Sequence, residues 1–204
     1  MGEFTFKRLS DLEDAYIEQV CQIFVNGFYD ELNIISSDKD KLIRIFAPSL
    51  IKEHFFVALD NNREVVGITA FATKTQASQI VDKEFMKEEF GNLKGRLLTS
   101  ILNKKSTHIK KNQCNIEKVA TASEYRGKGV ATQLINHILS ELPYEEFILE
   151  AMGANKSAVF VYKNLGFRVY KNLGFRVYKT RKQLIFHEKI GFAKRLYMKK
   201  EMKS

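Results

Sequence analysis

The chain has 204 residues, 45% of them hydrophobic and only two of them prolines, a composition typical of a compact domain and not of a disordered segment. No apolar run approaches the roughly 20 residues of a membrane span, and the amino-terminal residues lack a signal-peptide pattern. The net charge of +9 arises in residues 151–204, where 14 basic side chains accompany two acidic ones; an anionic partner or a solvated surface would explain this surplus. We expect one domain over 1–204, cytoplasmic and without a membrane partner.

The hydrophobic pattern predicts strands and helices in mixed order. In chain order, we expect a strand at 4–9, helices at 10–28 and 38–46, strands at 55–59 and 65–72, a helical excursion within 74–112, a strand at 114–121, a helix at 130–142, a strand at 147–150, a helix from 155, and strands within 175–188 and 191–200. Ser10 and Glu13 form a capping box that predicts the start of the first long helix. This order indicates an α/β (α+β) domain in which helices pack on a central sheet.

Cysteine and histidine usage gives no sign of a disulfide or a metal. Cys21 and Cys114 fall in different expected elements and form no C-x-x-C pair, as is usual for reduced thiols. The four histidines have no spacing typical of ligands, so we predict no metal site. No basic helix or nucleic-acid motif appears, so a nucleic-acid partner is not expected.

A glycine-rich turn, Arg126-Gly127-Lys128-Gly129, lies between a predicted strand and a predicted helix. The glycines let the backbone approach a ligand closely, and the two cations add charge-assisted contacts. Because the first N–H groups of a helix have no partner within it, such a turn is typical of a phosphate site. The Walker pattern is absent, and Thr132 stands where a dinucleotide fingerprint needs its third glycine. A solvated turn before a helix is the alternative.

A second motif follows about two dozen residues later. Asn155, Ala158 and Tyr162 are three or four residues apart, so they share one helix face, and Gly166 is placed to end that helix before Phe167. With the turn, which has the pattern Arg-x-x-Gly-x-Ala, this segment resembles the GNAT superfamily of acyl-CoA-dependent N-acetyltransferases, and the bacterial members most closely. The resemblance covers roughly residues 4–200.

The resemblance implies a GNAT-like mixed, mostly antiparallel sheet with helices on both faces. It also implies acetyl-CoA as co-substrate and a small-molecule or peptide amine as acceptor, and it leaves a homodimer open. In the family, a splay beside the motif strand frees backbone N–H groups to polarise the thioester. The implied donor-binding residues are Val119, Ala120, Thr121, Arg126, Gly127, Lys128, Gly129, Val130, Ala131, Thr132 and Asn155.

Two catalytic roles follow from the same resemblance. Tyr162 matches the family's usual general acid, which protonates the CoA thiolate. Glu150, five residues before Asn155, matches the base of the subgroup that resembles ribosomal-protein alanine acetyltransferases. Glu117 is the rival base on the motif strand, whereas Asn115 cannot accept a proton. Each of these two glutamates is equally explained as a strand carboxylate that pairs with a neighbouring lysine. For the protein as a whole, the alternative function is a non-catalytic acyl-CoA-binding module of the same fold.

Two segments have no settled place in this scheme. The charged excursion at 74–112 forms either a lid over the acceptor site or an extra helix that covers the core. Residues 161–176 are a tandem duplication of VYKNLGFR. Eight residues turn a helix face by about 80°, so Tyr162 and Tyr170 cannot both point to one site, and only Tyr162 keeps the register of the motif. We expect the second copy to form a loop or to start a strand.

Overall fold

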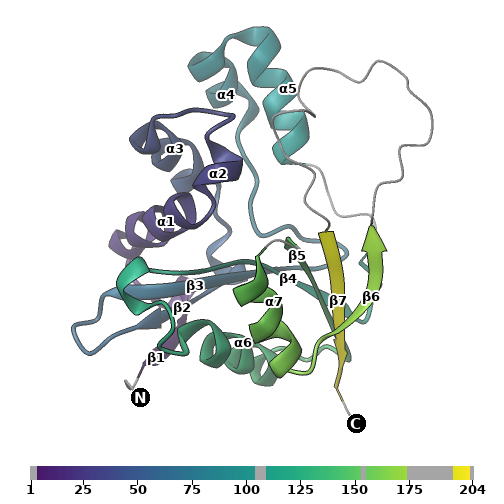
Figure 1. Cartoon of the computed structure of the whole chain (residues 1–204). Helices are drawn as coiled ribbons and strands as arrows, with labels where there is room; N and C mark the ends of the chain where they lie inside the picture. Colours follow the sequence, from purple (N-terminus) through teal and green to yellow (C-terminus); the bar gives the residue numbers. More distant parts are fainter. Residues whose placement is uncertain (1–3, 104–108, 153–154, 174–194, 203–204) are drawn as a thin grey trace.

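The computed structural model describes residues 4–103, 109–152, 155–173 and 195–202 (Figure 1). The helices and strands are β1 (Thr5–Arg8), α1 (Ala15–Gly27), α2 (Tyr29–Leu32), α3 (Lys39–Phe46), β2 (Phe55–Leu59), β3 (Val65–Ala72), α4 (Lys83–Phe90), α5 (Asn92–Leu102), β4 (Gln113–Thr121), α6 (Val130–Glu141), β5 (Glu146–Met152), α7 (Lys156–Asn164), β6 (Arg168–Leu173) and β7 (Arg195–Glu201). None of the described helices is long and apolar enough to cross a membrane.

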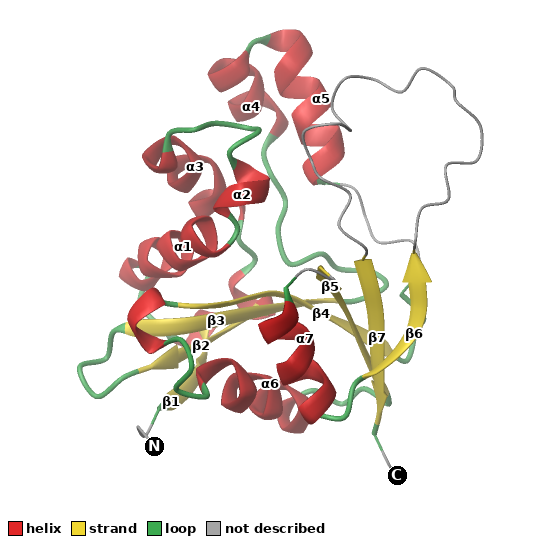
Figure 2. Ribbon diagram, in the orientation of Figure 1, coloured by secondary structure: helices red, strands yellow, loops and turns green. Residues whose placement is uncertain are grey.

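The strands form one seven-stranded sheet in the order β1-β2-β3-β4-β5-β7-β6. Every neighbouring pair is antiparallel except β4 and β5, which are parallel and are connected through α6. Helices α1 and α3 cover one face of the sheet, and α6 and α7 cover the other (Figure 2). The expected mixed, mostly antiparallel sheet with helices on both faces is therefore confirmed.

The strands divide the core into two layers because successive side chains of a strand point to opposite faces. Phe55 and Val57 pack with α1 and α3, whereas Phe56 and Ala58 pack with α6. Helix α6 contributes the apolar side that its sequence predicts, with Leu134, Ile135 and Ile138 fully buried. These two layers hold β4 and β5 at the centre of the molecule, where the functional motifs lie.

The predicted capping box at the start of the first helix is wrong. Leu9–Asp11 form a 3-10 turn, the Ser10 hydroxyl donates to the Asp11 carboxylate (3.3 Å), and α1 begins only at Ala15. Leu9 is completely buried, so its packing fixes this segment as a turn before the helix begins. The capping-box pattern is local, and a buried neighbour overrides it. The hairpin of β2 and β3 and helix α3 form as predicted, and the structure adds that the Asp38 carboxylate caps α3 by accepting the Lys41 N–H (3.0 Å).

The excursion at 74–112 contains a pair of helices, α4 and α5, joined at Gly91. They pack closely, since a Cβ atom on Gly95 would lie 2.4 Å from the backbone oxygen of Met86. The Lys41 ammonium binds the Glu89 carboxylate (2.9 Å), which attaches the pair to α3. Met86 and Leu98 are buried in the same core layer as α1 and α3, so the pair covers part of the core. Its role at the acceptor site stays a prediction.

The duplicated segment changes conformation between its copies. The first copy supplies the last turn of α7 and ends with Arg168, the first residue of β6; the second copy supplies the rest of β6, which pairs with β7. The second copy therefore starts a strand, one of the two outcomes expected. The strand expected within 175–188 falls in residues 174–194, which lie outside the described residues. Strand β7 confirms the strand expected within 191–200.

Candidate active site

Strands β4 and β5 separate at the centre of the sheet. Their parallel pairing begins at Gln113↔Glu146 and ends at Ile116↔Leu149. Beyond this point β4 remains paired with β3 and β5 with β7. Among the described residues, β4 and β5 form no further pairs with each other after Ile116 and Leu149. The facing backbone edges of residues 117–121 and 150–152 are thus open, as the family resemblance implies for the donor site.

A β-bulge lies on β4 where this separation begins. Ala70 pairs with Glu117 and Ile68 with Ala120, so Lys118 and Val119 together oppose a single residue of β3. Lys118 has a φ of 54°, in the left-handed region. Because the bulge adds one residue, Val119 contacts the α6 layer and Ala120 lies in the α1 layer. The bulge therefore sets the direction of the three strand residues predicted to bind the donor.

The glycine-rich turn leads directly into α6. Gly127 and Gly129 have φ values of 77° and 82°, which glycine adopts readily. Gly129 precedes the first helical residue, Val130, and no side chain among the described residues caps this end of α6. Arg126 and Lys128 are exposed beside it. The N–H groups of the first turn are thus accessible, and the arrangement suits a phosphate group.

Sequence reasoning missed the residues that hold this turn. The Tyr125 hydroxyl donates to the Asp60 carboxylate (2.7 Å), which also accepts the N–H groups of Asn62 and Glu64 (both 2.9 Å). The Tyr125 hydrogen bond is the main cause that lowers the pKa of Asp60, and the same bond raises the pKa of Tyr125. The Lys128 ammonium lies 4.6 Å from the centre of the Tyr125 ring. The turn between β2 and β3 therefore supports the loop, a contact no local motif would reveal.

A polar groove of about 490 Å³ opens beside the turn, between α1 and the end of β4. Thr121 and Arg126, two of the predicted donor-binding residues, line it together with Asn26 and Lys39 from the opposite wall. Gly27 allows α1 to approach β4 here, because a Cβ atom on it would lie 2.8 Å from the Cβ of Ala120. The groove gives a polar, water-accessible surface next to the candidate phosphate site.

The second motif forms α7 as predicted. The Asn155 side chain caps the helix by accepting the N–H of Ala158 (3.0 Å) and the hydroxyl of Ser157 (2.9 Å). This oxygen therefore has a structural role, while Asn155 itself remains exposed. Tyr162 is 8% exposed and packs edge-on against Phe167, with 6.3 Å between the ring centres. Burial raises the pKa of Tyr162 to about 12, so its phenol is protonated at neutral pH.

The candidate base lies on the opposite face of the sheet from Tyr162. Tyr162 packs in the layer of α6, together with Leu149 of β5. Glu150 follows Leu149 and therefore points to the other face, where Ile148 is buried. Glu150 is exposed and interacts with another residue. The two predicted catalytic residues thus lie on opposite faces of the sheet.

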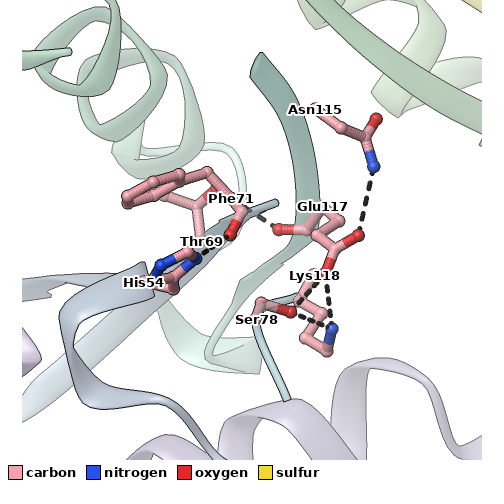
Figure 3. A network of polar contacts seen from close by, with 7 residues as sticks. All are labelled: His54, Thr69, Phe71, Ser78, Asn115, Glu117 and Lys118. Atoms are coloured by element: carbon pink, nitrogen blue, oxygen red, sulfur yellow. Dashed lines mark hydrogen bonds and ion pairs between the residues drawn. The ribbon is translucent and has the colours of Figure 1, made fainter. Parts of the chain in front are cut away.

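Glu117 shares the face of Glu150 but is enclosed in a polar network (Figure 3). Its carboxylate accepts hydrogen bonds from the Lys118 ammonium (2.8 Å), the Asn115 amide (3.1 Å) and the Ser78 hydroxyl. Burial alone would raise the pKa of Glu117, but the Lys118 charge and the three hydrogen bonds outweigh it and lower the pKa. A carboxylate held in this way is a weaker base than a free one.

Ser78 and Lys118 were not identified from sequence. Ser78 lies 39 residues before Glu117, and nothing in its neighbourhood indicates a site. Lys118 has a weak signal, because the apolar residues Cys114, Ile116 and Val119 break the two-residue alternation of a strand. Such a break indicates a bulge without revealing the contacts of the side chain.

His54, to the left of the network in Figure 3, makes contacts that support the fold. Its Nδ1 lies 2.9 Å from the backbone oxygen of Phe71, and its ring stacks on that of Phe71 with 4.5 Å between centres. Within the described residues, no three His, Cys, Asp or Glu side chains group as a metal site.

The acetyltransferase (GNAT) family profile matches residues 17–167, and the chain belongs to this family. Solved structures with the same fold include an N-acetyltransferase from Staphylococcus aureus Mu50, with 16% identity and a TM-score of 0.64 over 96% of this chain and 100% of that one. A histone acetyltransferase HPA2 and related acetyltransferase from Corynebacterium glutamicum has 20% identity and a TM-score of 0.61, over 100% and 98%. A chimeric spermidine N-acetyltransferase from Vibrio cholerae has 16% identity and a TM-score of 0.57, over 97% and 95%. No curated protein matches the chain by sequence.

Proposed function

We propose that the protein transfers an acetyl group directly from acetyl-CoA to a primary amine of a small molecule or peptide. The observation that carries this proposal is the opening between β4 and β5 after Ile116 and Leu149. The glycine-rich turn and Tyr162 lie with the α6 layer on one face, and the carboxylate of Glu150 lies on the other. A donor and an acceptor that meet in this opening would each approach from a different face.

The donor is held by the loop and the strand edge. The N–H groups at the start of α6, from Gly129 to Thr132, and the cations of Arg126 and Lys128 suit its phosphates. The open edge of Val119 to Thr121 suits the pantetheine arm, and the family resemblance adds Asn155, the residue that caps α7. Acetyl-CoA supplies the acetyl group as a thioester, whose carbonyl carbon is open to attack by an amine.

The chain's own residues then move two protons. Glu150 accepts a proton from the acceptor nitrogen as that nitrogen forms its bond to the acetyl carbon. Tyr162 donates its hydroxyl proton toward the sulfur as the carbon–sulfur bond breaks. Since burial keeps this phenol protonated, Tyr162 enters each cycle as a donor. We assign the base to Glu150 because the Glu117 carboxylate is already enclosed by three hydrogen-bond donors.

The acceptor is placed by the helical pair. Helices α4 and α5 lie on the same side of the sheet as Glu150 (Figure 2). The end of α5 is joined to the segment before α4, because the Asn103 side chain accepts the Val81 N–H and donates to the Val81 backbone oxygen (each 2.8 Å). We propose that the excursion at 74–112 borders the acceptor and so contributes to the choice of amine.

The first experiment measures thermal unfolding with acetyl-CoA, CoA and ATP. A ligand at 100 times its dissociation constant stabilises a protein by about 2.7 kcal/mol, which raises Tm by roughly 5–10 °C for a domain of this size. We expect a shift with acetyl-CoA and CoA but not with ATP; the absence of any shift at millimolar acetyl-CoA refutes the donor site.

Turnover of a panel of amines then separates an enzyme from an acyl-CoA-binding module. We expect Tyr162→Phe and Glu150→Gln each to lower kcat by about 10²–10⁴-fold while the shift with CoA persists. Undiminished turnover in either variant removes that residue from the mechanism. Binding of CoA without acetylation of any amine would favour the non-catalytic module.

A further inference from the structure

Lys118 occupies a strained position at the opening of the sheet. Among the described non-glycine residues only Arg63 and Lys118 have a positive φ, and Arg63 belongs to the turn after β2, where such a conformation is common. Lys118 instead lies inside a nine-residue strand, at its bulge. A side chain with a Cβ atom disfavours this conformation, so other contacts must hold it.

Those contacts come from the Lys118 side chain itself (Figure 3). Its ammonium donates to the Ser78 hydroxyl oxygen (2.6 Å) and to the Glu117 carboxylate (2.8 Å). The Ser78 hydroxyl in turn donates to the same carboxylate oxygen. Ser78 is 1% exposed, and the Lys118 side chain is 14% exposed. The Glu117 side chain is 29% exposed, so the three side chains form a closed set that is partly shielded from water, where charged hydrogen bonds are stronger.

Ser78 is fixed independently of the strand. Its backbone oxygen accepts the N–H of Ile51 (2.9 Å), and the Ile80 N–H donates to the backbone oxygen of Ser49 (2.8 Å). Leu50 and Gln79 form a β-bridge between these two bonds. The hydroxyl that meets Lys118 and Glu117 therefore projects from a segment held by backbone hydrogen bonds to the connection after α3.

We propose that Ser78, Glu117 and Lys118 are positioning residues that anchor the bulge of β4 to the segment before α4. The anchor keeps the open edge of residues 119–121 in place for the thioester of the donor, so the inference rests on the proposed function. Glu117, a candidate base by sequence, acts here through the strand and not on the substrate. The same network links the segment that carries α4 and α5 to the strand where the donor binds.

The variant Lys118→Gly tests the contacts of the Lys118 side chain while it leaves the positive φ of the backbone allowed. Glycine adopts a positive φ without steric cost, so this variant removes the Lys118 side chain, and with it the ammonium contacts, without straining the backbone. We expect kcat for acetylation to fall about 10²-fold, because a small displacement of preorganised donors has an effect of this size. The KM for acetyl-CoA should stay near its wild-type value, since the phosphate turn is untouched. A wild-type kcat in Lys118→Gly would overturn the proposal.

Ser78→Ala provides a milder change that removes one hydroxyl from the network. We expect a smaller fall in kcat than in Lys118→Gly, and less than additive losses in the double variant, because both changes break the same set of contacts. Lys111→Met and Ser140→Ala, at exposed positions outside the network, are the matched controls and should retain wild-type kcat. Additive losses in the double variant would overturn the idea of a single anchor.

A second measurement does not depend on turnover. Backbone amide chemical shifts and hydrogen exchange at residues 117–121 should change in Ser78→Ala and in Lys118→Gly, while those of β1 and β2 stay the same. Unchanged amides at the bulge in both variants would overturn the anchor. If the wild-type protein acetylates no amine, the proposed function fails, yet these amides still report whether the network holds the strand.

Discussion

Replacement of Gly127 by alanine tests the phosphate turn with an internal control. Gly127 has a φ of 77°, and a Cβ atom there would meet nothing within 4 Å. Gly91, between α4 and α5, has a φ of 78° and the same open space. An alanine forced into a positive φ costs about 1–2 kcal/mol, which lowers Tm by roughly 2–8 °C in a chain of this length. Gly91 also has a ψ of 162°, where alanine is still less favourable, so Gly91→Ala should lose at least as much stability.

Both variants should lose stability, but only Gly127→Ala should lose affinity for the donor. The methyl group of Gly127→Ala would occupy the space proposed for the phosphate of the donor, whereas that of Gly91→Ala would lie on the helical pair. We expect the Kd for acetyl-CoA, measured by calorimetry, to rise about tenfold or more for Gly127→Ala, equivalent to about 1.4 kcal/mol, and to stay unchanged for Gly91→Ala. Wild-type affinity in Gly127→Ala, or an equal loss in both variants, would refute the assignment of the turn.

Three further predictions concern stability and the support of the site. Gly95→Ala should lower the free energy of unfolding by about 1–3 kcal/mol in denaturant titrations, because its Cβ atom would lie 2.4 Å from a backbone oxygen of α4; a neutral result would contradict the close packing of the two helices. Asp60→Asn should raise the Kd for acetyl-CoA, because it weakens the hydrogen bond from Tyr125 that supports the turn; an unchanged Kd would mean that the turn needs no such support. Burial raises the pKa values of Cys21 and Cys114 from 9.0 to about 12, so both thiols lose their protons at a lower pH in the unfolded chain than in the folded protein. The free energy of unfolding should therefore fall as pH rises from about 9 to 12, by about 1.4 kcal/mol per pH unit for each thiol, and Cys21→Ala should flatten the fall.

The sequence predicts those parts of the site that depend on local pattern. The turn from Arg126 to Gly129 and the helix from Asn155 to Tyr162 are each specified by residues a few positions apart, and both form where expected. The faces of the strands also follow from alternation once the buried residues are known. Alternation alone does not tell which helices cover each face of the sheet. The placement of Tyr162 and Glu150 on opposite faces could therefore be seen only in the structure.

The supporting contacts could not be predicted because they join distant parts of the chain. Ser78 meets Glu117 across 39 residues, and Asp60 meets Tyr125 across 65. Neither pair belongs to a motif, and each depends on how β3 lies beside β4. The capping box at Ser10 failed for the related reason that tertiary packing outweighs a local preference worth about 1 kcal/mol.

The two copies of VYKNLGFR have different secondary structures, and this has a consequence for mutagenesis. Lys163 lies in helix α7, whereas its counterpart Lys171 lies in strand β6. Threonine is a poorer helix former than lysine but a better strand former. One and the same exchange, lysine to threonine, should thus destabilise the protein at the first copy and stabilise it at the second, each by a few tenths of a kcal/mol. Within this octapeptide, the effect of a substitution therefore depends on the secondary structure of the copy in which it is made, although the two copies have the same sequence.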